Sequence, residues 1–325
     1  MPADRAALER LHAIPRLPLP WFPPPIEVLD RLGRALGATA PLFVKRDDAI
    51  PAGFGGNKIR KLQIVAAQAV AEGADTLITT GGIQSNHARA TASIAARLGL
   101  GCVLVANGTP QERPTANALL DRLLGAEVRY VPAREGRAPA MADAAEELRG
   151  RGRRPFVIPL GASTAHGAAA FALAIAELLT QMPAPETILL ATSSGGTQAG
   201  IIAGCALYGL STHIIGISAD DPAHVIAGEI RRILTDLETL LDVPTGQLSG
   251  SRIDIDDPFV GGGYGMPTPE STAAIELCAR SEALFLDPTY TGKAMAGLIA
   301  RVRGRQLGDG VTLFWHTGGQ VGLFA

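Results

Sequence analysis

The chain has 325 residues, of which 47% are hydrophobic and 18% charged, and its formal net charge is −2. This length can bury a sizeable core and suffices for one large or two medium domains. The near-neutral balance without long charged blocks argues against a nucleic-acid partner, and no apolar run is long enough for a membrane span. With no apolar signal segment near the N-terminus, we expect a cytoplasmic protein.

The predicted elements begin with the proline-rich residues 1–25, which we expect to form an extended arm. Apolar residues at helical spacing predict a helix over 26–36, and 41–45 is a predicted strand. Further helices are predicted over 57–73, 85–98, 116–124, 138–149, 165–179 and 200–208, and strands over 76–80, 102–106, 127–131, 156–160, 187–192 and 213–218. Short apolar strands that alternate with longer helices indicate an α/β fold with parallel sheets covered on both faces.

Lys58 is a candidate for covalent chemistry. It is one of only four lysines against 25 arginines, and it follows Gly55, Gly56 and Asn57 at a predicted helix start. A lysine amine can lose its proton and form an imine with a carbonyl compound, whereas a guanidinium stays charged. Lys58 is therefore a candidate Schiff-base residue. The alternative is an ordinary solvated lysine at a helix start.

A second glycine-rich segment, Ser193–Gly200, lies between a predicted strand and a predicted helix. Backbone N–H groups at such a turn bind anions, and glycines let a phosphate approach closely. The segment has neither the dinucleotide pattern nor a Gly-Lys-Ser/Thr ending, which favours a single phosphate monoester. An imine-forming lysine and a monophosphate site together imply pyridoxal 5′-phosphate. The alternative is a glycine turn with a purely structural role.

A third cluster, Gly81–His87, also joins a strand end to a helix start. Free N–H groups of the first helical turn and the Ser85 hydroxyl are candidates to hold a substrate carboxylate, and Asn86 to contact a phenolate oxygen. The alternative is a simple helix cap at Ser85. A Ser85–His87 nucleophile pair is disfavoured, because residues two apart on a helix do not face each other.

Two of the four tyrosines lie in C-terminal loops. Tyr264 stands within Gly261–Gly265, and Tyr290 within Asp287–Lys293, while Phe314–Gly319 predicts a strand end at a glycine turn. A buried ring with a bonded hydroxyl is the alternative for either tyrosine. The three cysteines are far apart, and no Cys-x-x-Cys motif occurs, so neither a metal site nor a disulfide is predicted.

The combination and order of these motifs resemble the D-cysteine desulfhydrase and 1-aminocyclopropane-1-carboxylate deaminase family of fold-type II pyridoxal-phosphate enzymes, from about residue 14 onward. The resemblance implies a two-domain, three-layer α/β fold like that of the tryptophan synthase β subunit, with parallel and mixed sheets and usually a homodimer. We expect a large cofactor-binding domain of residues 1–55 and 161–325, and a small substrate-side domain of residues 56–160, with the cofactor in the cleft between them.

The resemblance also implies residue roles. Lys58 would form the Schiff base, and Lys58, Ser85, Tyr264 and Tyr290 would be catalytic. Further cofactor contacts would come from Asn57, Asn86, Ser194, Gly195, Gly196, Thr197, Gln198, Gly200, Thr291 and Thr317. A small amino-acid substrate would be bound by Gln84, Ser85, Asn86 and His87.

Two positions separate the branches of this family. The deaminases resemble one another in carrying Glu and Leu where this chain has Thr291 and Thr317. A carboxylate near the pyridine nitrogen would favour ring opening, whereas a threonine hydroxyl suffices for expulsion of a thiolate. The expected reaction is therefore β-elimination of D-cysteine to pyruvate, ammonia and hydrogen sulfide.

Three alternatives remain open: cyclopropane ring opening to 2-oxobutyrate and ammonia, a related lyase such as an L-cysteate sulfo-lyase, and a non-enzymatic phosphate- or nucleotide-binding module. Ser163 and Thr164 depart from the usual Ser-Asn of the family, which leaves the substrate undecided.

Overall fold

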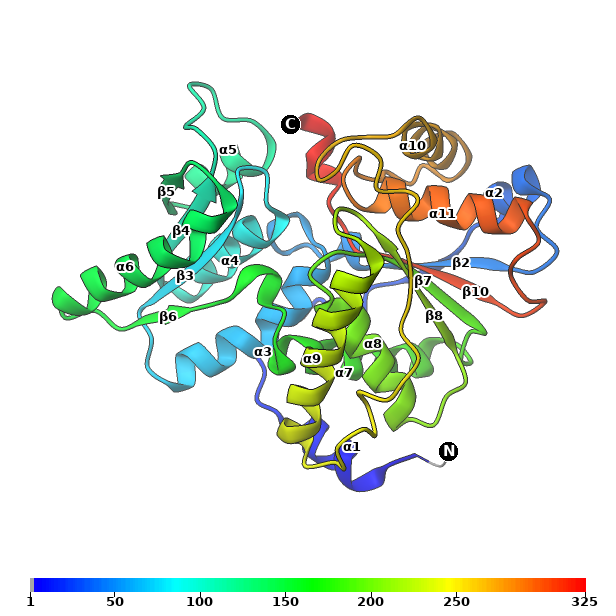
Figure 1. The fold of residues 1–325 in the computed structure, drawn as a ribbon, viewed down its shortest axis with the longest axis horizontal. Helices are drawn as coiled ribbons and strands as arrows, with labels where there is room; N and C mark the ends of the chain where they lie inside the picture. The colour runs from blue at the N-terminus through cyan, green and yellow to red at the C-terminus, as the bar shows by residue number, and fades with distance from the viewer. Residues whose placement is uncertain (1–2) are drawn as a thin grey trace.

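Two separate sheets organise the chain in the computed structural model, which describes residues 3–325 (Figure 1). The smaller sheet has four parallel strands in the order β5-β4-β3-β6. These strands are β3 (Thr76–Gly82), β4 (Gly101–Asn107), β5 (Glu127–Val131) and β6 (Pro155–Val157). The associated helices are α3 (Asn57–Ala71), α4 (Asn86–Leu98), α5 (Ala116–Leu123) and α6 (Arg137–Gly150). Apolar side chains of α3 and α4 form the core on one face, and those of α6 cover the other.

The larger sheet has six strands in the order β1-β2-β10-β7-β8-β9, and only the edge strand β1 runs antiparallel. Its strands are β1 (Ile26–Val28), β2 (Leu42–Arg46), β7 (Thr187–Thr192), β8 (His213–Ser218), β9 (Asp254–Asp256) and β10 (Thr312–His316). One face carries α1 (Arg5–Ala13), α7 (Ala165–Gln181), α8 (Gly196–Leu207) and α9 (Ala223–Leu241). The other carries α2 (Asp30–Leu36), α10 (Pro269–Glu282) and α11 (Thr291–Arg303).

Burial on both faces explains the apolar strands. In β7 every residue is buried, with Ile188 and Leu190 in one core and Leu189 and Ala191 in the other. Alternate side chains of a strand point to opposite faces, so a sheet covered by helices on both sides needs an unbroken apolar run. The predicted α/β class with parallel and mixed sheets is confirmed.

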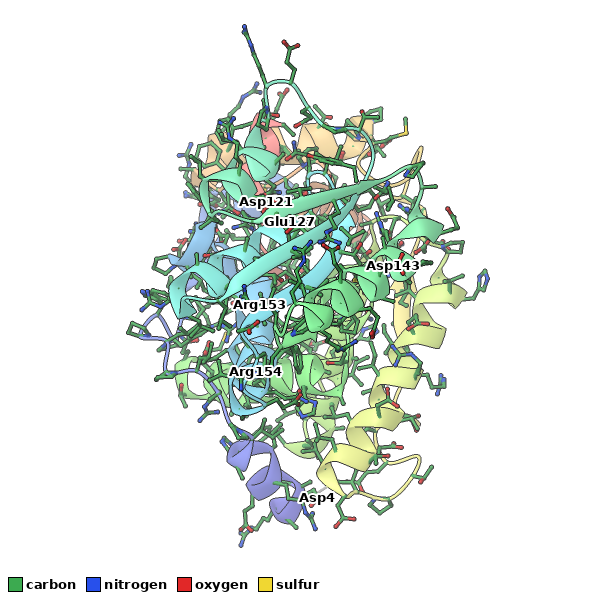
Figure 2. All side chains as sticks on the ribbon, turned by 90° about the vertical axis from the view of Figure 1, so that its left-hand side faces the viewer. Asp4, Asp121, Glu127, Asp143, Arg153 and Arg154 are labelled. Carbon is green, nitrogen blue, oxygen red and sulfur yellow. The ribbon has the colours of Figure 1, made fainter. Side chains whose placement is uncertain are left out.

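The prediction of an extended arm over residues 1–25 is wrong for part of it. Residues 5–13 form α1, whose N-cap Asp4 accepts a hydrogen bond from the Ala7 amide at 3.1 Å. Ala7 and Leu11, one turn apart on that helix, are buried against the larger sheet's core. Figure 2 shows Asp4 near the lower end of the molecule and Asp121, on α5, in its upper half.

Three further predictions need correction. The predicted helix over 26–36 is β1 followed by the shorter α2. The predicted strand over 156–160 is confined to β6, because the chain turns into a short 3₁₀ helix, Leu160–Ala162. α8 begins at Gly196, four residues earlier than predicted, since its N-cap Gly195 takes a positive φ of 74° that ends the turn. α9, β9 and α10 were not predicted.

The strands divide as the predicted domains would require, with the small sheet built from residues 76–157 and the larger sheet from segments on either side. α3 nevertheless contributes to both cores, through Ile64 in the larger and Ile59 and Leu62 in the smaller. The proposed division into a substrate-side and a cofactor-binding domain stays a prediction. Within residues 3–325, no helix combines the length and apolar character that a membrane crossing needs.

Candidate active site

A cavity lies where loops from the two sheets meet. Of the residues predicted for the site, twelve line this cavity: Asn57, Lys58, Ser85, Asn86, His87, Ser194, Gly195, Gly196, Thr197, Tyr264, Tyr290 and Thr317. Four predicted residues do not line it: Gln84, Gln198, Gly200 and Thr291. Segments more than 250 residues apart in the chain thus converge on one hollow. The chemical role of each residue stays a prediction.

The glycine bend before α3 positions Lys58. Gly55 and Gly56 have φ angles of 70° and 102°, which side chains other than glycine rarely adopt. A Cβ at Gly55 would stand 2.4 Å from the carbonyl oxygen of Asp48, so this close approach excludes a larger residue. The next amide, that of Asn57, donates to the carbonyl of Thr317 at 2.9 Å. The bend therefore joins the start of α3 to the loop after β10.

Lys58 is half-buried, and its amine approaches Gly161, where an added Cβ would stand 3.4 Å from Nζ. Burial lowers the pKa of the Lys58 amine to about 8, although the nearby charge of Asp220 partly opposes the shift. No carboxylate of residues 3–325 forms a salt bridge with it. Desolvation disfavours the ammonium form, so the amine is partly neutral near physiological pH. Lys58 is not the solvated lysine of the alternative interpretation.

A buried ionic cluster fixes α3 beneath Lys58. The Arg60 guanidinium donates to both carboxylate oxygens of Asp47 at 2.8 Å and pairs with Glu177 on α7 at 2.9 Å. The indole of Trp315 on β10 also donates to Asp47, at 2.8 Å. A bidentate guanidinium pair with this extra donor has a defined geometry. It ties the first turn of α3 to the larger sheet.

The loop between β7 and α8 has the features of a phosphate site. Gly195 caps α8 without a side-chain bond, and the first helical N–H groups of any helix lack intrahelical partners. Thr197 Oγ1 accepts a hydrogen bond from the Asn57 side chain at 2.9 Å, and the Ser194 hydroxyl is bonded to that of Ser163 at 2.8 Å. The free amides and the hydroxyls can donate hydrogen bonds to a small anion. The glycines, which have no Cβ, leave space for it to approach the backbone.

Lys61 places a buried amine beside this loop and was not predicted as a site residue. Its fully buried amine donates to the Gly161 carbonyl at 3.1 Å, and a Cβ on Gly196 would stand 2.8 Å from it. Burial, and secondarily the charge of Lys58, hold the pKa of Lys61 well below its usual range. An anion at Gly196 would favour its ammonium form. The donor set therefore fits a monoester phosphate.

The glycines of this segment differ in role. A Cβ at Gly200 would stand 2.2 Å from the carbonyl oxygen of Ala168, so Gly200 permits close packing of α8 on α7. The Gln198 amide donates to the Asp254 carbonyl at 2.8 Å, beside β8 and β9. For these two residues the structure shows packing and strand contacts, while Gly195 and Gly196 face the cavity.

Ser85 caps α4 and also lines the cavity. Its hydroxyl accepts from the Ala88 amide at 3.2 Å, as the simple cap interpretation predicts. A Cβ on Gly81 would stand 2.3 Å from that hydroxyl, so glycine is required for the chain to turn here. The N-terminus of α4 therefore borders the cavity, where its dipole favours a carboxylate.

Asn117 on α5 orients the loop before α4. Its side chain donates to the Asn86 side-chain oxygen and to the Gln84 carbonyl, both at 2.9 Å. Because its oxygen is occupied, Asn86 presents its amide nitrogen as a donor. Gln84 contributes by accepting from the Asn117 amide at 2.9 Å, which holds the loop in place outside the cavity.

His87 is buried and neutral. Thr79 donates its hydroxyl proton to the Ile158 carbonyl at 2.8 Å, so its oxygen accepts from His87 Nε2, also at 2.8 Å. Burial, with the charges of Lys58 and Lys61, holds the pKa of His87 well below its usual range. His87 therefore contributes a neutral imidazole to the cavity wall.

The two predicted tyrosines form a pair. The Tyr290 hydroxyl donates to that of Tyr264 at 2.8 Å, and the rings meet edge to face with centroids 5.8 Å apart. Both rings border the open cavity, yet burial raises the pKa of each phenol, that of Tyr290 most. Both hydroxyls are therefore protonated at neutral pH.

Thr291 lies behind Tyr290 and is fully buried. Its hydroxyl donates to Asp287 at 2.7 Å and accepts from the Asp287 amide at 2.8 Å. The same carboxylate accepts from the amides of Thr289 and Tyr290. Thr291 thus shapes the loop that carries Tyr290, whereas Thr317 lines the cavity.

Sequence reasoning missed Asp220, Arg134 and Arg137, which also line the cavity. Asp220 follows β8 and accepts from the Ser193 hydroxyl at 2.9 Å, and burial raises its pKa. Arg134 and Arg137 follow β5. Their position after predicted strands could have identified them, because ligands of open α/β sheets bind beyond the carboxyl ends of the strands.

Comparison with known proteins gives a consistent result. A family model described as pyridoxal-phosphate dependent enzyme matches residues 18–318. The chain is 40% identical to a D-cysteine desulfhydrase of Yersinia enterocolitica over 97% of both chains, and 40% identical to one of Klebsiella pneumoniae over 98% of both. A crystal structure titled as an ACC deaminase homologue has a TM-score of 0.91 at 34% identity, covering 99% of this chain and 97% of its own. The fold is shared with threonine deaminase isoform 2 of Solanum lycopersicum. That structure has a TM-score of 0.69 at 17% identity, covering 98% of this chain and 86% of its own.

Proposed function

Given that this chain belongs to the family of pyridoxal-phosphate dependent enzymes, we propose that it converts D-cysteine to pyruvate, ammonia and hydrogen sulfide. The observation that carries the proposal is that Lys58 and the candidate phosphate site at Gly195 and Gly196 line the same cavity. Burial lowers the pKa of the Lys58 amine to about 8. Relatives 40% identical over nearly the whole chain carry this activity in their names.

The residues present fit pyridoxal phosphate. When bound, this cofactor supplies an aldehyde that amines attack and a conjugated ring that accepts an electron pair from Cα. Lys58 is the residue that would bind the aldehyde. Gly195, Gly196 and Thr197 would hold the phosphate with Lys61 as the charged partner, and Asn86 would donate to the ring.

The remaining side chains suit an amino-acid substrate. The N-terminus of α4, with Ser85, is placed to hold the substrate carboxylate. The Lys58 amine, partly neutral, accepts the proton from Cα. The protonated Tyr290–Tyr264 pair supplies a proton to the departing thiolate.

We also propose a cytoplasmic homodimer, with residues 56–160 as the substrate-side domain and residues 1–55 with 161–325 as the cofactor-binding domain. The resemblance of the motifs to the family supports the homodimer and the two domains, and the location of the cavity between the two sheets supports the division into domains.

The main alternative is opening of 1-aminocyclopropane-1-carboxylate, since the related crystal structure is titled as an ACC deaminase homologue. Thr291 and Thr317 favour desulfhydration, because they stand where the deaminases carry Glu and Leu, so this chain lacks the carboxylate at position 291. The test is keto-acid release from both cysteine enantiomers, both cysteate enantiomers, β-chloroalanine and the cyclopropane acid. Fastest release of pyruvate and sulfide from D-cysteine supports the proposal. Faster formation of 2-oxobutyrate from the cyclopropane acid would replace it with the alternative.

A further inference from the structure

The buried amine of Lys293, in the first turn of α11, is held entirely by backbone carbonyls. It donates to the carbonyl oxygens of Ala219 at 2.9 Å, Val260 at 2.8 Å and Gly263 at 2.9 Å. A neutral amine has only two N–H groups, so three such bonds need the ammonium form. Burying a charge is costly unless its partners replace the lost water, and here three carbonyl dipoles do so.

This arrangement is that of a bound monovalent cation. Carbonyl oxygens that converge on one point replace the hydration shell of potassium ions in proteins. An ammonium is a compact charge with three donors on one nitrogen, whereas no nitrogen of a guanidinium carries three hydrogens. The geometry therefore needs a lysine even in this arginine-rich chain. Burial lowers the pKa of Lys293, and the charges of Asp220 and Asp287 oppose that shift.

Two of the three carbonyls adjoin residues of the cavity. The Gly263 carbonyl belongs to the peptide group that precedes Tyr264, and the Ala219 carbonyl to the peptide group that precedes Asp220. Tyr264 and Asp220 both line the cavity. The ammonium of Lys293 thus joins the loop that carries Tyr264 to the end of β8.

The loop that carries Tyr264 has only weak backbone bonds of its own. Residues 257–266 lie between β9 and α10, and Gly261, Gly263 and Gly265 have positive φ angles of 62°, 118° and 76°. Glycine permits many backbone conformations, so the contacts of such a loop decide its conformation. The backbone hydrogen bonds within this segment are 3.2 to 3.4 Å long, whereas those from the ammonium are 2.8 to 2.9 Å.

We propose that Lys293 is a positioning residue, whose ammonium acts as a built-in cation that holds Tyr264 in place to protonate the leaving group. This inference rests on the proposed function, because it concerns the proton donor for the departing sulfur. Tyr290 donates its hydroxyl proton to Tyr264, so the Tyr264 hydroxyl keeps its own proton for a group in the cavity. A shift of this loop by about 1 Å would misplace that proton and lower the rate by on the order of 100-fold.

The proton transfer balances within the proposed reaction. The Cβ–S bond of D-cysteine breaks with its electron pair on sulfur, the Tyr264 proton joins this sulfur, and hydrogen sulfide leaves. Lys58 meanwhile holds the proton taken from Cα. Water carries that proton back to the Tyr264 phenolate, so no further reactant is needed.

Two substitutions separate the charge of Lys293 from its packing. Lys293→Ala removes the ammonium and leaves room for a free cation, whereas Lys293→Met removes it and fills most of the same space with an apolar side chain. Arg303→Ala, at an exposed position in the last turn of the same helix, controls for the loss of one positive charge. Each holoenzyme is checked by circular dichroism and by its cofactor absorption band. Then kcat and KM are measured for D-cysteine and for β-chloro-D-alanine.

Both Lys293 variants should lower kcat for D-cysteine by about tenfold or more, with KM changed by less than about threefold. Chloride leaves without a proton, so kcat for β-chloro-D-alanine should fall by less than about threefold. Arg303→Ala should match the wild type with both substrates.

Added cations test the carbonyl site itself. Ammonium or potassium chloride at about 0.1 M should raise kcat of Lys293→Ala for D-cysteine by at least about threefold, since either cation can bind the vacated carbonyls. Choline chloride at the same concentration should not, because its cation is too large. Lys293→Met and the wild type should respond to none of the three salts, because their carbonyl site is filled.

A double-mutant cycle tests whether Lys293 acts through Tyr264. Tyr264→Phe removes the proton donor, so Lys293→Ala added to it should lower kcat by less than about twofold more. A second loss as large as that caused by Lys293→Ala in the wild type would overturn the proposal.

Other results would also overturn it. One is a kcat of Lys293→Ala for D-cysteine within about threefold of the wild type, and another is an equal loss for β-chloro-D-alanine. A folded Lys293→Ala variant that responds to neither ammonium nor potassium would exclude the built-in cation. Failure of both Lys293 variants to fold would give this residue a purely structural role.

Failure of the proposed function has a different signature. The wild-type enzyme would then release no sulfide from D-cysteine. Thermal unfolding of the Lys293→Ala holoenzyme would still shift to higher temperature with ammonium chloride and not with choline chloride, since ligands that bind the folded state stabilise it.

Discussion

The reactivity of Lys58 depends on how far burial lowers the pKa of its amine. With a pKa of about 8, roughly 9% of the amine is neutral at pH 7, against about 0.03% for a lysine at its ordinary value. The structure thus predicts that about 300 times more Lys58 is able to attack a carbonyl at this pH. The carboxylate of Asp220 opposes the shift, so Asp220→Asn should lower the Lys58 pKa further.

Competitive acetylation measures this directly. The cofactor-free protein is treated with trace acetic anhydride from pH 6 to pH 11, and the peptide containing Lys58 is quantified by mass spectrometry against N-acetyl-lysine amide. We expect the Lys58 reactivity to level off above about pH 8, and at lower pH in Asp220→Asn. An inflection at pH 10 or higher would refute the argument that desolvation activates Lys58.

Three further predictions concern the residues around Lys58. Gly196→Ala places a Cβ 2.8 Å from Lys61 Nζ and should weaken the binding of pyridoxal phosphate, measured by equilibrium dialysis. The control Gly228→Ala, whose added Cβ has no atom within 4 Å, should bind the cofactor as tightly as the wild type. Equal affinities of the two variants would argue against the phosphate site. Tyr290→Phe should keep the absorption band of the bound cofactor but lower kcat for D-cysteine by about 100-fold, and an unchanged kcat would remove the tyrosine pair from proton transfer. Asp47→Asn should cost on the order of 3 kcal/mol of unfolding free energy in urea, because it uncouples the buried Arg60, and a loss below about 1 kcal/mol would contradict that role.

Much of the fold could be predicted because strand and helix patterns are local. The fully buried β7 has an unbroken apolar run, and its predicted bounds agree with the structure, as do those of β5 and β8. The arm containing α1 could not be predicted from proline content, since that helix is stabilised by burial of Ala7 and Leu11 on a distant core. Tertiary burial decides such short amphipathic segments.

The site divides in the same way. Glycine turns before helix starts identified the loops around Lys58, Ser85 and Gly195, because the backbone conformations that these turns need favour glycine, which can be read from the sequence. The orientation of side chains within the loops depends on their hydrogen-bond partners in the folded structure. The Thr291 hydroxyl, for example, donates to the Asp287 carboxylate and does not line the cavity. The arginines after β5 carry no local motif, and only the sheet brings them to the cavity.

The most direct test of the whole account is product formation by purified enzyme and its Lys58→Ala variant with D-cysteine. We predict equal amounts of pyruvate and sulfide from the wild-type enzyme, none from the variant, and loss of the cofactor's visible absorption band in the variant. Sulfide release that survives in Lys58→Ala, or a wild-type protein that binds no pyridoxal phosphate, would contradict the account.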